Sequence, residues 1–127
     1  MFGILKLKMN RIGFFKKQDI YQITRIVGFQ DNILGVTFDD KNNSGDNIEV
    51  IEWDLPCIDK SRNKTSQEEV LEQVRSGLKL VNQSLGTNYQ LSRIYFSPFD
   101  ISTNRIYSGL IVTLIIHYHT GKEFEEL

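Results

Sequence analysis

The stretch Ile106–His119, with the sequence IYSGLIVTLIIHYH, decides how the fold of this chain is predicted. Between Leu110 and Ile116 only Thr113 is polar, and β-branched residues dominate. This pattern is typical of a β-strand that is buried on both faces. Such a strand needs cover on both sides, and the chain offers one convincing helix to provide it. The stretch therefore predicts a sheet protein whose core is completed by another sheet or another subunit.

A β-hairpin is predicted upstream. From Ile20 onward, apolar residues share one face of an extended strand: Tyr21, Ile23, Val27 and Phe29. The polar residues 30–32 predict a turn, after which Ile33–Phe38 returns as the second strand of the hairpin.

Two more strands follow in the chain. The segment Ile48–Asp54 alternates cleanly, with Glu49, Ile51 and Trp53 on one face and the residues between them on the other. Pro56 ends this strand because proline cannot donate to a β-ladder. A further strand is predicted for residues 89–96.

One long helix is predicted between these strands. Ser66 and Glu69 fit a capping box, with the serine as N-cap. Apolar residues then recur at helical spacing and form one stripe: Val70, Val74, Leu78, Val81 and Leu85. Gly86 suits the position just beyond the helix end. Gly77 lies beside the stripe, where a close approach of the helix to the sheet would explain a residue that weakens helices.

Together these elements predict an α+β fold in a single domain over residues 1–127. We expect an antiparallel-rich sheet of about five strands in the order β-β-β-α-β-β, with one long helix packed on one face. Residues 1–17 follow neither the helical nor the strand period. They are therefore open between a loosely packed N-terminal extension and a segment that folds back over the sheet.

Composition limits the functional classes. The 127 residues are 40% hydrophobic and 24% charged, with a formal net charge of −1, so no global field favours nucleic acid or a membrane surface. The single cysteine, Cys57, excludes an internal disulfide and fits a reducing compartment, which predicts a cytoplasmic protein. No apolar stretch reaches the length of about 18 residues that spans a bilayer.

His117 and His119 are the two histidines of the chain and the candidate metal ligands. On a strand, residues separated by one position point to the same face, so both imidazoles could bind one metal ion. The site is incomplete because a zinc or iron ion needs a further protein ligand, and spacing does not single out Glu123 or Cys57 for that role.

Other motifs favour structural roles. Asp40–Gly45 matches the first half of a calcium-binding EF-hand loop, but Ile51 stands where a bidentate glutamate is needed. Aromatic and basic residues are interleaved in Arg93–Phe96 and Arg105–Tyr107, a mixture that can stack nucleic-acid bases on an open sheet. The near-neutral charge disfavours that function. No motif for a cofactor, a phosphate or a catalytic nucleophile is present.

These observations favour a non-enzymatic interaction or regulatory module that self-associates. A homodimer is predicted because one helix cannot cover both faces of the stretch, and Ile111, Thr113 and Ile115 are the predicted interface residues. One alternative is a small metal- or ligand-binding enzyme that uses His117 and His119. Another is a weak nucleic-acid-binding module. No cofactor and no membrane contact are expected, and the sequence does not identify a further protein partner.

Overall fold

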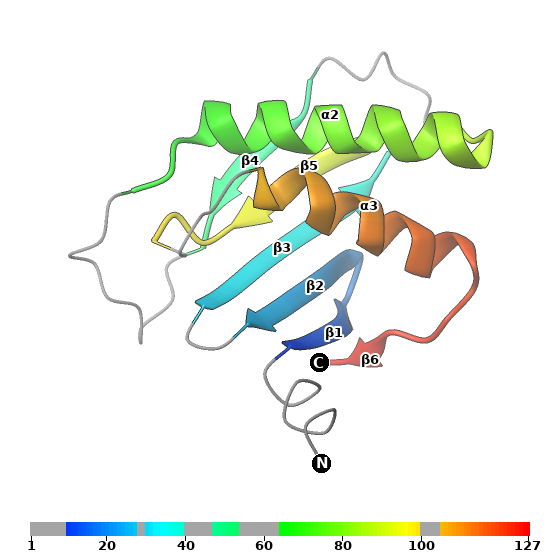
Figure 1. Ribbon diagram of the computed structural model, residues 1–127, viewed down its shortest axis with the longest axis horizontal. Coiled ribbons are helices and arrows are strands. Elements are labelled where there is room, and N and C mark those ends of the chain that lie inside the picture. The colour runs from blue at the N-terminus through cyan, green and yellow to red at the C-terminus, as the bar shows by residue number, and fades with distance from the viewer. Residues whose placement is uncertain (1–9, 28–29, 40–46, 54–63, 100–104) are drawn as a thin grey trace.

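The computed structural model describes residues 10–27, 30–39, 47–53, 64–99 and 105–127 (Figure 1). The elements in chain order are β1 (Asn10–Lys17), β2 (Ile20–Val27), β3 (Gln30–Phe38), β4 (Glu49–Glu52), α2 (Gln67–Leu85), β5 (Leu91–Phe96), α3 (Ile106–His119) and β6 (Glu125–Glu126). The two helices lie side by side over the same face of one sheet. This arrangement confirms the predicted α+β class.

The six strands form a mixed sheet in the order β4-β5-β3-β2-β1-β6. Its centre, from β1 through β2 and β3 to β5, is antiparallel. The outer pairs β4–β5 and β1–β6 are parallel. Parallel neighbours need a crossover connection, and α2 provides it between β4 and β5. The sheet is therefore antiparallel-rich as predicted, with parallel pairs added at both edges.

The predicted hairpin is present with a different turn. Residues 30–32 already belong to β3, so the turn predicted there is wrong, and the two connecting residues 28–29 lie outside the described residues. A second hairpin joins β1 to β2, and Gln18 in its turn has a positive φ of 56°. The described part of the ambiguous segment 1–17 thus forms a full strand beside β2.

Helix α2 follows its sequence signals closely. The Ser66 hydroxyl accepts a hydrogen bond from the Glu69 backbone N–H at 3.2 Å, which confirms the N-cap. Gly86 ends the helix at φ 67°, where a side chain would be strained, and its N–H donates to the Asn82 carbonyl. The predicted apolar stripe is buried against the rest of the molecule, with Val70, Val74 and Val81 in the core.

The predicted strand Ile106–His119 is wrong, because these 14 residues form helix α3. The preference of β-branched residues for strands is weak, and tertiary packing overrides it. A run of 14 residues is also longer than most strands. A helix that is apolar over most of its surface suits a position where it packs against a sheet on one side and a second helix on another. Helix α3 occupies such a position, and its Tyr107, Ile111, Leu114 and Ile115 side chains are completely buried.

Gly77 explains how the two helices pack. A Cβ atom added there would lie 2.5 Å from both the Ile111 Cγ2 and the Ser108 carbonyl oxygen, closer than real atoms approach. The close approach predicted at Gly77 is therefore real, but its partner is α3 and not the sheet. The helices are also joined by Gln73, whose side-chain oxygen accepts the Tyr107 backbone N–H at 3.1 Å.

Candidate functional site

The two histidines lie in the last turn of α3 and point in different directions. Successive residues of an α-helix are rotated by about 100°, so positions separated by two face nearly opposite sides. The His117 Nε2 donates to the Glu123 carbonyl at 2.6 Å, and its ring stacks on Phe14 with centroids 3.6 Å apart. The His119 Nδ1 instead pairs with the Tyr89 hydroxyl at 2.7 Å.

The helix therefore separates the candidate metal ligands. The prediction that His117 and His119 share a face required residues 106–119 to form a strand, and these residues form a helix. Within the described ranges, no three His, Cys, Asp or Glu side chains are grouped to hold a metal ion. Cys57 and the EF-hand-like loop Asp40–Gly45 lie outside the described residues. Both histidines instead connect the end of α3 to neighbouring segments: His117 contacts Phe14, and His119 contacts Tyr89.

The predicted interface residues are also placed by α3. Ile111 and Ile115 are completely buried inside the chain. Thr113 is partly exposed, and its hydroxyl donates to the Gly109 carbonyl at 2.9 Å. These three residues therefore do not form an exposed face, and any surface for self-association has to be sought elsewhere on the molecule.

The sheet has one face that neither α2 nor α3 covers. Alternation along the strands places Ile23, Leu34 and Ile94 under the helices, where they are completely buried. The residues between them point the other way. We call that side the open face and define it by its large apolar and aromatic residues: Phe15, Ile20, Ile26, Ile33, Ile51, Trp53 and Tyr95.

Two aromatic side chains on the open face lie over strand glycines. A Cβ added to Gly35 would meet the Trp53 ring at 2.7 Å, and one added to Gly13 would meet the Phe15 ring at the same distance. The Trp53 ring also stacks on Tyr95, with centroids 5.4 Å apart and 21° between the ring planes. Aromatic cover compensates for glycines within strands. It also adds apolar ring surface to this face.

Charged residues flank the aromatic stack. Arg93 and Glu49 are register partners on β5 and β4. The Arg93 Nη1 donates to the Tyr95 hydroxyl at 3.3 Å. This hydrogen bond raises the pKa of the Arg93 guanidinium, which like any arginine is cationic throughout the physiological range. Of the second aromatic–basic segment, Tyr107 is completely buried in the core and does not reach this face.

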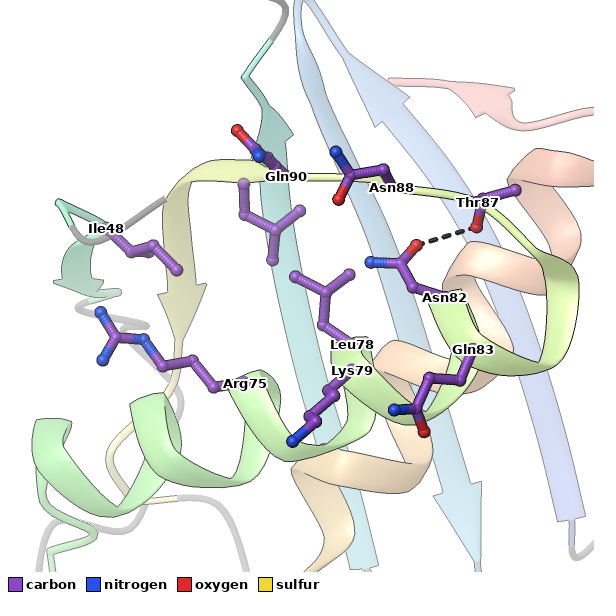
Figure 2. A pocket seen from close by; sticks show the side chains of 10 residues that line it. Ile48, Arg75, Leu78, Lys79, Asn82, Gln83, Thr87, Asn88 and Gln90 are labelled. Atoms are coloured by element: carbon purple, nitrogen blue, oxygen red, sulfur yellow. Dashed lines mark hydrogen bonds between the residues drawn. The ribbon is translucent and has the colours of Figure 1, made fainter. Parts of the chain in front are cut away.

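A cavity of about 450 Å³ lies between α2 and the segment that leads into β5 (Figure 2). Arg75 extends toward Ile48, whereas Lys79 points away from Asn88 and Gln90. The Asn82 side-chain amide forms three hydrogen bonds. Its oxygen accepts from the Thr87 hydroxyl at 2.8 Å and from the Tyr89 backbone N–H at 2.9 Å. Its nitrogen donates to the Tyr89 carbonyl at 3.0 Å. Asn82 thus holds the end of α2 against the strand that follows.

The residues that line this cavity favour a structural role over a catalytic one. Its lining consists of Ile48, Arg75, Leu78, Lys79, Asn82, Gln83, Thr87, Asn88, Gln90 and Leu91. This set includes no carboxylate, histidine or cysteine that could serve as a general base or a nucleophile. The open face is therefore the stronger candidate for function.

Sequence reasoning found the alternation of the strand that carries Trp53 but did not find the open face. The available signal was the pair of glycines within strands, Gly13 and Gly35, since such glycines often lie under an aromatic ring. Recognising that signal required the register of β1 against β2 and of β3 against β5.

Two further observations complete the description of the site. Neither helix in the described part of the chain has the length and apolarity needed to cross a lipid bilayer. Comparison with known proteins found no matching family model, no matching curated protein and no matching solved structure.

Proposed function

We propose that the protein is a non-enzymatic interaction module that associates with a second copy of itself through the open face. The observation that supports the proposal is the one-sided cover of the sheet by α2 and α3 (Figure 1). On the other side Ile26 is 37% exposed, and Phe15, Ile51 and Trp53 are partly exposed. Soluble monomers rarely leave contiguous apolar patches larger than about a few hundred Å² in water.

A second copy suits this surface in shape and charge. In a symmetric dimer the same patch is buried on both copies. Flat faces of two sheets pack well at a separation of about 10 Å. The formal net charge of −1 leaves little repulsion between copies. Glu49 and Arg93 lie side by side on the open face, so a two-fold arrangement can place each carboxylate near the guanidinium of the partner.

The test is the mass in solution, measured by light scattering after size exclusion at micromolar concentration. We expect about twice the chain mass of 14.8 kDa. Ile26→Lys and Ile51→Lys place a charge on the open face, and each should convert the dimer to a monomer because a buried, unpaired charge is costly.

Leu80→Lys is the matched control. Leu80 is 59% exposed on α2, in the other layer of the molecule, so this variant should stay dimeric. A wild-type mass of 14.8 kDa, or a dimer that survives both open-face substitutions, would overturn the proposal.

The same face distinguishes the two alternative functions. Arg93 beside stacked aromatic rings is a feature of surfaces that bind single-stranded nucleic acid. A monomer that binds single strands with steep salt dependence would replace the dimer proposal with that function. The alternative of a metal-dependent enzyme has no comparable support, since its two histidines point apart and each already has a hydrogen-bond partner.

A further inference from the structure

A second cavity, of about 330 Å³, lies under the first half of α3 on the helix-covered side of the sheet. Four α3 residues on one helix face form its roof: Ile106, Gly109, Leu110 and Thr113. Its floor comes from β1 and β2, where Ile12 and Arg25 are register partners and Ile23 lies beside them. Because this cavity is on the opposite side from the open face, it is independent of the proposed dimer.

Gly109 adds open space at the edge of this cavity. A Cβ added to Gly109 would have no heavy atom within 4 Å, so α3 leaves open space there. Gly109 is itself exposed, so this open space is continuous with solvent. Near this gap Ile12 is 47% exposed, which gives the cavity an apolar wall that is accessible from solvent. The volume is at the lower end of the range for small-molecule pockets, about 300–1,000 Å³.

Two guanidinium groups line this apolar space. The Arg25 side chain is partly buried, and within the described residues it forms no ion pair. Arg105 has its ion pair with Glu72 at 3.6 Å, and both side chains are mostly exposed. A partly buried cation without a counter-charge is unfavourable unless something neutralises it. A guanidinium donates two parallel hydrogen bonds to a carboxylate, which is the anion that matches its planar shape.

We propose that this cavity binds a small carboxylate with an apolar body. The carboxylate lies against Arg25 and Arg105, and the apolar body occupies the space that Gly109 leaves beside Ile12 and Leu110. Neither part suffices alone: the ion pair needs the partial burial that the apolar body completes, and the apolar body is too small to bind well without the ion pair.

The experiment is an amide-resolved NMR titration of the full chain with octanoate below its micellar concentration. We expect saturable shifts at Gly109, Leu110 and Ile12. Octanamide lacks the charge, and acetate lacks the apolar body, so both should bind at least about ten-fold more weakly. Equal binding of either control ligand would overturn the proposal, as would octanoate shifts located elsewhere.

Three variants locate the site. Arg25→Gln should weaken octanoate binding about ten-fold or more. It should not lower the melting temperature, because it removes a partly buried charge that lacks a counter-charge. Gly109→Leu fills the cavity and should abolish binding while the protein stays folded. Lys79→Gln removes a cation outside this cavity and should bind octanoate as the wild type does. Unchanged affinity in both Arg25→Gln and Gly109→Leu would refute the assignment.

Discussion

Helices α2 and α3 lie on the same face of the sheet but depend on different sources of stability. Helix α2 has a serine N-cap, two acidic residues in its first turn and a left-handed glycine at its end. The N-cap residue of α3 is Arg105, which has a positive φ of 57° and makes no side-chain cap hydrogen bond. The first helix is specified by local signals, whereas the second is a β-branched segment held helical by its surroundings.

The comparison of α2 with α3 shows that apolar content alone does not identify secondary structure. In α2 the polar and apolar residues alternate with the helical period, so only a helix buries the stripe. In α3 the central residues 110–116 are all apolar except Thr113, so this pattern does not distinguish a strand from a helix. Its contacts with the sheet and with Gly77 of α2 then decide between them.

Removing a core contact of α3 should have the largest effect. Leu114 is completely buried, so Leu114→Ala should lower the free energy of unfolding by about 2–5 kcal/mol, through lost burial and the cavity that remains. Ile116, on the same helix, is 44% exposed, and Ile116→Ala should cost less than about 1 kcal/mol. Denaturant unfolding measures both. Equal losses would show that α3 is not held by the packing described above.

The two helix glycines give a matched pair of intermediate effects. Gly77→Ala forces α2 and α3 apart and should destabilise the protein by about 1–3 kcal/mol. Gly109→Ala meets open space and should stabilise it by about 0.4–1 kcal/mol, because alanine favours the helix. Thermal unfolding of both variants should give shifts of opposite sign. Stabilisation by Gly77→Ala would contradict the close helix approach.

Loss of the α2 cap should have a smaller effect. Ser66→Ala removes the hydrogen bond to the Glu69 N–H and should cost about 1 kcal/mol in urea unfolding. Ser84→Ala changes an exposed serine within the same helix and should be neutral or slightly stabilising. If the two variants behaved alike, the cap would not contribute to the local stability that distinguishes α2 from α3.

The candidate sites were less predictable than the fold class. The alternation of β4 correctly placed Ile51 and Trp53 on one face, but nothing in the sequence indicated that this face would be left uncovered. The prediction that both histidines point to the same side was wrong. Residues i and i+2 share a face in a strand but point to nearly opposite sides of a helix. The sequence did not predict a binding role for Arg25, because Arg25 lies beside a cavity only where α3 packs over β1 and β2.

The sequence by itself determined α2, from its cap at Ser66 to Gly86, together with the strands of the central hairpin and the alternation of β4. Each of these rests on interactions between residues close in the chain or on a period that only one structure can satisfy. Only the tertiary structure decided that Ile106–His119 is helical, that Gly77 faces α3, and that both helices lie on the same side of the sheet. An apolar segment without a period carries no local preference strong enough to resist packing, so its conformation is chosen by the surfaces it meets.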